Sequence, residues 1–139
     1  MLLGQLLKSV GKNYHKIYVR GICFDSRKVK KGYIFFAIRG QKTSGANFIN
    51  EAISKGASAI ISDKKTKHKN YPIPLILVKD VKISLSEACS KYYKKKPSNI
   101  IAVTGTNGKS SVAHFFYQIL KLNVVPVASI GTLGIFFKN

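Results

Sequence analysis

The hydrophobic and polar positions of this 139-residue chain form short apolar runs separated by amphipathic stretches. Runs rich in aromatic and β-branched residues predict strands, and apolar residues three or four positions apart predict helices. Strands that alternate with helices indicate an α/β fold. The predicted strands span residues 17–24, 33–38, 57–61 and 75–78, and the predicted helices span residues 2–10, 48–53 and 81–94.

The ends of the predicted helices carry suitable residues. Gly11 follows the first helical stretch, where a glycine often lies just past a helix C-terminus. Asp80 precedes the third helix, and its carboxylate can accept hydrogen bonds from the free backbone N–H groups there. Pro97 ends that helix. We therefore expect a first domain over residues 1–96 and the beginning of a second domain over residues 98–139.

The segment from residue 100 to residue 111 carries the clearest chemical signal. It reads Ile-Ile-Ala-Val-Thr-Gly-Thr-Asn-Gly-Lys-Ser-Ser, and an amphipathic helical pattern follows over residues 112–120. We expect a strand over the apolar part. Gly105 and Gly108 allow backbone N–H groups to converge on an anion, and the helix adds its positive N-terminal end. The segment predicts a phosphate-binding loop.

Two side chains of this loop would reach a bound nucleotide. Lys109 would contact its terminal phosphates, and the Ser110 hydroxyl would bind Mg²⁺. The general pattern places a further glycine at the position of Val103, so the loop is a shorter Gly-x-x-Gly-Lys-Ser variant. The alternative is an ordinary glycine turn with a surface lysine and a serine helix cap.

Several segments together resemble one protein family. Residues 104–111 are similar to the ATP loop of the Mur ligases and of folylpolyglutamate synthases, which usually reads TGTNGKTT or TGTNGKTS. Residues 24–37 resemble a first-domain signature of the Mur ligases that folylpolyglutamate synthases lack. Residues 40–57 follow the same family's G-x4-G-x2-FI-x-EAI-x2-GA pattern, and residues 130–134 resemble its IGT-x-G segment. The resemblance covers nearly the whole chain.

This resemblance implies a fold and a set of binding residues. The fold would be a small N-terminal α/β substrate domain, which holds the uridine diphosphate end of a nucleotide sugar, followed by the start of a P-loop-type nucleotide domain with a parallel sheet. Lys109 would be catalytic, and Ser110 would bind Mg²⁺. The matching positions are Phe24, Ser26, Gln41, Lys42 and Thr43 for the nucleotide sugar, and Gly105, Thr106, Asn107, Gly108, Lys109, Ser110 and Ser111 for ATP.

The chemistry of the nucleotide-sugar positions suits their implied role. Phe24 could pack on a ring, Ser26 could donate a hydrogen bond, and residues 41–43 offer an amide, an ammonium and a hydroxyl group. From the residues alone, Phe24 could equally be a core residue and Ser26 a turn former. Residues 41–47 could equally be an ordinary polar loop.

The implied activity is ATP-dependent amide synthesis in peptidoglycan precursor synthesis. ATP would phosphorylate the free carboxylate of UDP-N-acetylmuramoyl-L-alanyl-D-glutamate. The amine of a diamino acid, meso-diaminopimelate or L-lysine, would then attack the acyl phosphate. Lys109, the loop amides and Mg²⁺ would neutralise charge at the transferring phosphoryl group. The IGT-x-G segment favours an E-type over an F-type ligase, and a non-catalytic module that binds a uridine nucleotide is a further alternative.

The length of the chain suggests a fragment. Ligases of this family have three domains in a much longer chain, and residues 98–139 are too few to bury both faces of a sheet. We therefore interpret the sequence as an N-terminal fragment that is inactive by itself, and we expect the full-length enzyme to be a monomer.

The charge of the chain would by itself suggest a nucleic-acid partner. Twenty-four lysines and arginines against five acidic residues give a net charge of +19. Most of these cations are scattered lysines, and the runs over residues 64–69 and 94–96 are typical of solvated loops and helix ends. We find no reading motif for nucleic acid and expect no specific nucleic-acid partner.

The remaining features favour a cytoplasmic protein without a membrane partner. The two cysteines have no metal-ligand spacing, and the three histidines form no cluster, so neither zinc nor a disulfide framework is indicated. The apolar residues 1–7 are too few for a signal peptide or a membrane span.

Overall fold

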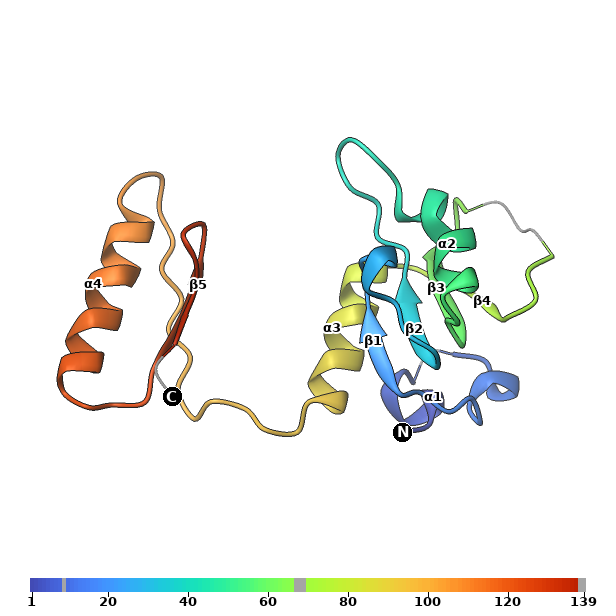
Figure 1. Ribbon diagram of the computed structural model, residues 1–139, viewed down its shortest axis with the longest axis horizontal. Helices are drawn as coiled ribbons and strands as arrows, with labels where there is room; N and C mark the ends of the chain where they lie inside the picture. Colours follow the sequence, from blue (N-terminus) through green and yellow to red (C-terminus); the bar gives the residue numbers. More distant parts are fainter. Residues whose placement is uncertain (9, 67–69, 138–139) are drawn as a thin grey trace. The chain divides into compact units, whose positions relative to one another are not determined.

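The computed structural model describes residues 1–8, 10–66 and 70–137. These residues form two compact units, Met1–Lys96 and Pro97–Asn139. Each unit is drawn in its own range of colours in Figure 1. Part of the predicted lysine-rich loop, residues 67–69, lies outside the described residues.

The first unit is a four-stranded parallel sheet covered by helices on both faces. The strand order is β1-β2-β3-β4, and each neighbouring pair is parallel. Helices α1 and α3 pack on one face and α2 on the other (Figure 1). The α/β prediction is confirmed. The elements are α1 (Leu3–Leu6), η1 (Lys12–Tyr14), β1 (Gly21–Cys23), η2 (Ser26–Lys28), β2 (Tyr33–Phe36), η3 (Gly45–Phe48), α2 (Ile49–Ser54), β3 (Ala59–Asp63), β4 (Leu75–Val78) and α3 (Val81–Tyr92).

The core of this unit follows from the alternation of side chains along its central strands. On β2, Ile34 and Phe36 contribute to the cluster that includes α1 and α3, whereas Phe35 contributes to the cluster that includes α2. On β3, Ile61 contributes to the cluster with α1 and α3, and Ile60 contributes to the cluster with α2. Because both faces are covered, these strands are apolar at consecutive positions, as is usual in parallel sheets.

Helix α3 begins where the sequence predicts. The Asp80 carboxylate accepts hydrogen bonds from the backbone N–H groups of Lys82 and Ile83, at 2.8 and 3.0 Å. The helix ends at Tyr92, slightly before the predicted end. Its predicted apolar face does contact the core, through Val81, Leu85, Ala88 and Tyr92.

The first predicted helix is much shorter than expected. Helix α1 covers Leu3–Leu6 and not the whole of residues 2–10. The N-terminal segment pairs with a later part of the chain, since Leu3 N–H donates to the Ile17 carbonyl and Val19 N–H donates to the Met1 carbonyl, at 2.9 and 2.8 Å. These long-range hydrogen bonds hold the residues at the start of a single helical turn against residues 17–19.

The second unit contains helix α4 (Lys109–Leu122) and an antiparallel hairpin of β5 (Ala128–Gly131) and β6 (Gly134–Phe137). The predicted helix is confirmed, but the strand predicted over residues 100–103 is wrong. No strand among the described residues of this unit pairs with that segment, and Ile100 is 81% exposed. The sheet among the described residues of this unit is the two-stranded antiparallel one of β5 and β6.

Within residues 1–8, 10–66 and 70–137, no helix is both long enough and apolar enough to cross a bilayer.

Candidate functional site

The loop before α4 has the backbone conformation expected of an anion-binding turn. Gly105 has φ +144° and Gly108 has φ +74°, values that L side chains rarely adopt. A Cβ atom at Gly108 would meet no heavy atom within 4 Å, so its backbone angle and not crowding requires glycine. Gly108 is the N-cap residue of α4, and the loop therefore leads directly into the positive end of the helix.

Lys109 places its ammonium group against this loop. Its Nζ donates hydrogen bonds to the carbonyl oxygens of Gly105 and Thr106, the second at 3.0 Å. A lysine ammonium has three N–H donors, so a third remains for a phosphate oxygen. The loop thus combines backbone N–H groups, a helix N-terminus and a cation. This combination suits a nucleotide phosphate.

Ser110 is the second residue of α4, and its hydroxyl lies 2.8 Å from the Thr132 hydroxyl. Mg²⁺ in nucleotide sites usually takes one or two protein oxygens and completes its shell with phosphates and water. A single serine hydroxyl beside a phosphate loop fits that donor set. Among the described residues, no group of three or more His, Cys, Asp or Glu side chains could hold a metal ion by itself.

Phe24 lies at the carboxyl end of β1 and is 65% exposed, so its interpretation as a core residue is wrong. It borders a hollow of about 290 Å³. In open α/β sheets, ligands bind outside the carboxyl ends of the strands. The hollow is lined by Ile22, Cys23, Phe24, Asp25, Lys28 and Tyr33.

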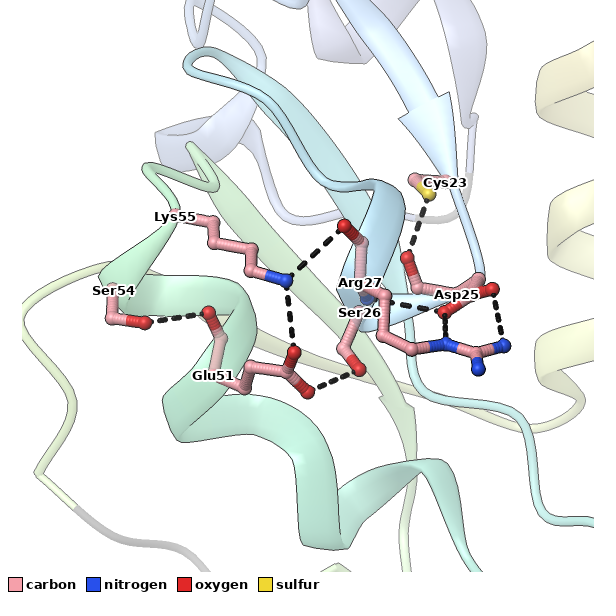
Figure 2. Close-up of polar contacts among 7 residues, drawn as sticks. All are labelled: Cys23, Asp25, Ser26, Arg27, Glu51, Ser54 and Lys55. Carbon is pink, nitrogen blue, oxygen red and sulfur yellow. Dashed lines mark hydrogen bonds and ion pairs between the residues drawn. The ribbon is translucent and has the colours of Figure 1, made fainter.

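Asp25 and Arg27, which follow Phe24 in the sequence, form an ion pair (Figure 2). The Asp25 carboxylate accepts hydrogen bonds from the Arg27 backbone N–H, from Nε and from Nη2, at 3.1, 2.9 and 2.9 Å. The hydrogen bond from the Arg27 side chain is the main reason why the pKa of Asp25 falls to about 2. The pair lies at the start of the η2 turn, directly after Phe24.

Ser26 lies inside this turn and is only 6% exposed. Its hydroxyl donates a hydrogen bond to Glu51 Oε2 at 2.6 Å, and Glu51 also pairs with Lys55 at 2.9 Å. Figure 2 shows that these contacts join the η2 turn to α2. The Ser26 and Lys55 contacts lower the pKa of Glu51. Ser26 thus has a partner within the protein, and its contact with a substrate stays a prediction.

Gln41, Lys42 and Thr43 are exposed in the loop that follows β2. The loop is closed by a hydrogen bond of 2.9 Å from the Gly40 backbone N–H to the Thr43 carbonyl. Strands β1 and β2 are parallel neighbours, so their carboxyl ends lie at the same end of the sheet. Phe24 follows one of these ends and the loop follows the other. The predicted nucleotide-sugar residues therefore all follow the carboxyl ends of β1 and β2. Ser26 is the buried residue among them.

Sequence reasoning did not assign roles to Glu51, Lys55 or Thr132. The spacing of Glu51 and Lys55, four residues apart on a predicted helix, is a recognisable signal for an ion pair. The contact between Ser110 and Thr132 spans 22 residues and depends on how the hairpin folds back on α4. Local pattern cannot reveal a contact of that kind.

The ion pair of Asp25 predicts a dependence of stability on pH. The folded-state pKa of about 2 lies below the ordinary value of 3.8, so the stabilisation is complete above the ordinary value and is lost as pH falls through about 2. Asp25→Asn removes it. The urea midpoint of the variant should therefore lie below that of the wild type near neutral pH, and the difference should shrink on acidification.

The matched control for this measurement is Asp80→Asn, because asparagine caps a helix about as well as aspartate. Its midpoint should stay near the wild-type value at neutral pH. A difference between Asp25→Asn and the wild type that stays constant from about pH 6 to about pH 2 would contradict the role of the ion pair.

Comparison with known proteins shows which family this chain belongs to. Residues 18–106 match the family model described as "Mur ligase family, catalytic domain". The UDP-N-acetylmuramoyl-L-alanyl-D-glutamate--2,6-diaminopimelate ligase of Rickettsia conorii is 50% identical over 118 residues, which are 84% of this chain and 24% of the relative. The ligase of the same name from Rickettsia prowazekii is 42% identical over 134 residues, 96% of this chain and 26% of the relative.

Solved structures of Mur ligases share the fold of this chain. A MurF ligase from Thermotoga maritima in complex with ADP is 28% identical, with a TM-score of 0.59 over 76% of this chain and 24% of that one. A structure of a UDP-N-acetylmuramoyl-L-alanyl-D-glutamate--2,6-diaminopimelate ligase shares the fold, with a TM-score of 0.75 over 99% of this chain and 28% of that one, at 24% identity. The chain spans about a quarter of the length of the curated relatives that it matches. It belongs to the Mur ligase family.

Proposed function

We propose that this chain supplies the nucleotide-sugar domain and the phosphate loop of an E-type Mur ligase, MurE. The ligase would use ATP and Mg²⁺ to join a diamino acid to UDP-N-acetylmuramoyl-L-alanyl-D-glutamate. The observation that carries the proposal is the loop from Gly105 to Ser110, where two glycines at positive φ lead into α4 and the Lys109 ammonium lies against the loop carbonyls. The names of the curated relatives support the same substrate.

In the proposed reaction the residues of the second unit act on ATP. The N–H groups of the loop, including those of Thr106, Asn107 and Gly108, bind phosphate oxygens, and Ser111 lies in the first turn of α4 beside them. Lys109 neutralises the charge that develops on the phosphoryl group as it moves to the substrate carboxylate. Mg²⁺, held by Ser110, supplies further positive charge when bound. ADP leaves in this transfer, the amine of the diamino acid then attacks the acyl phosphate, and inorganic phosphate and a proton leave as the amide bond forms.

The residues of the first unit hold the uridine nucleotide. Phe24 offers an exposed ring at a hollow large enough for part of a nucleotide. Lys42 on the neighbouring loop can face a phosphate, and Gln41 and Thr43 offer neutral hydrogen bonds. Ser26 acts mainly by fixing the turn, because its hydroxyl bonds to Glu51.

The full-length ligase would be a cytoplasmic monomer, with no specific nucleic-acid or membrane partner. The 139 residues by themselves would be inactive, because orientation of the acyl phosphate and the amine needs parts of the relatives that this chain does not match. An F-type ligase remains the alternative within the family, since MurF structures share the fold. A module that only binds a uridine nucleotide is the alternative outside catalysis.

Phe24→Ala tests the nucleotide-sugar site. Isothermal titration of the 139-residue chain with UDP-N-acetylmuramoyl-L-alanyl-D-glutamate should show an affinity about tenfold lower for the variant, because stacking of a base on an aromatic ring contributes about 1–3 kcal/mol. Phe115→Ala is the control, since Phe115 is similarly exposed at 61% but lies on α4. Equal affinities for the wild type and Phe24→Ala would exclude Phe24 from the site.

The same titrations separate a ligase fragment from a module that only binds a uridine nucleotide. A module that binds only a uridine nucleotide would bind the nucleotide sugar and not Mg²⁺-ATP. An E-type ligase fragment would bind both. A hybrid in which this chain replaces the matching quarter of the Rickettsia conorii ligase then tests turnover, as phosphate release that requires ATP, the nucleotide sugar and the diamino acid together.

A further inference from the structure

The turn of the β5–β6 hairpin contacts the start of α4 through one pair of side chains. Ser110 Oγ and Thr132 Oγ1 are 2.8 Å apart, and either hydroxyl can donate. Thr132 is one of the two turn residues between Gly131 and Gly134, which form the last paired position of the hairpin. The Ile-Gly-Thr-x-Gly segment therefore brings a hydroxyl group to the residue that follows Lys109.

Aromatic packing fixes the position of this turn. On β6, the Phe136 ring contacts the His114 ring edge-on, with centroids 5.6 Å apart, and lies 6.1 Å from the ring of Tyr117. Tyr117 is the buried residue of α4. A small hollow beside these contacts is lined by both Ser110 and Thr132. The hydrogen bond thus joins two elements that are already held together by packing.

We propose that Thr132 is a positioning residue that orients the Ser110 hydroxyl toward the Mg²⁺ of a bound nucleotide. The inference rests on the proposed function, because it takes Ser110 as the magnesium ligand. A hydroxyl that binds a cation must direct a lone pair at the cation and its proton elsewhere. Thr132 accepts that proton, which leaves the lone pairs of Ser110 free and reduces the number of rotamers that the serine occupies. This gives the Ile-Gly-Thr-x-Gly segment a chemical role.

Thr132→Val and Thr132→Ser test this role in the 139-residue chain. Valine keeps the branched shape and removes the hydroxyl, whereas serine keeps the hydroxyl. Isothermal titration with ADP should show that Thr132→Val weakens the affinity in the presence of Mg²⁺ about threefold to tenfold, the effect of one hydrogen bond. The affinity without Mg²⁺ should be unchanged. Thr132→Ser should bind like the wild type under both conditions.

The outcomes separate this inference from the proposed function. If the wild-type chain binds ADP no better with Mg²⁺ than without it, Ser110 is no magnesium ligand and both proposals fail. If the wild type shows the magnesium effect and Thr132→Val shows it equally, only the role of Thr132 is overturned. A loss in Thr132→Val that is the same with and without Mg²⁺ would show a merely structural role, and so would a loss of the magnesium effect in Thr132→Ser.

Discussion

Lys109→Ala should reduce the turnover of the hybrid ligase below detection, a loss of about a thousandfold or more. In the structure the Lys109 ammonium already lies against the loop carbonyls, with one donor left for phosphate. No other lysine or arginine of the described part of the second unit lies in this loop. Alanine would leave the migrating phosphoryl charge without its cation. Phosphate release in the presence of all three substrates measures the effect.

The matched control is Lys121→Ala, which removes a lysine from the last turn of the same helix. Lys121 lies over the Tyr117 ring, 5.9 Å from its centroid, and far along α4 from the loop. Its loss should cost little stability and leave turnover near the wild-type value. Near-normal turnover of Lys109→Ala, with a folded protein, would contradict the assignment of the loop.

Part of the fold could be predicted because it depends on local pattern. Helix α3 begins at Asp80 because a carboxylate there satisfies two backbone N–H groups, and this requirement is visible in the sequence. The strand over residues 75–78 agrees with β4, since a short β-branched run between turn residues is itself the signal. The helix after Gly108 followed from apolar spacing and from the glycine before it.

The rest depended on contacts that local pattern does not encode. Residues 100–103 have the composition of a strand, but a strand needs a partner for its backbone groups, and the described residues of that unit provide none. Helix α1 covers only Leu3–Leu6, and residues 1–4 at its start pair with residues 15–19. At the candidate site, the residue type of Ser26 suggested an available hydroxyl, whereas the fold brings Glu51 from α2 to bind it.

Phe35→Ala should destabilise the first unit more than any surface change. Residues 1–96 have their own sheet, helices and core, so we expect this segment to fold alone. A unit of this size has a free energy of unfolding of about 5–14 kcal/mol. Phe35 is 1% exposed, and truncating a buried phenylalanine costs about 3–5 kcal/mol. Urea denaturation of residues 1–96, followed by circular dichroism, measures the loss.

Ile83→Ala provides the comparison for a large apolar residue outside the core. Ile83 lies on α3 and is 69% exposed, so its truncation leaves no cavity. Alanine is also a better helix former than isoleucine, and the free energy of unfolding should stay within about 0.5 kcal/mol of the wild type. The pair of variants therefore tests the alternation along β2, which assigns Phe35 to the cluster under α2. Equal stability of Phe35→Ala and Ile83→Ala would show that Phe35 does not lie in a packed core.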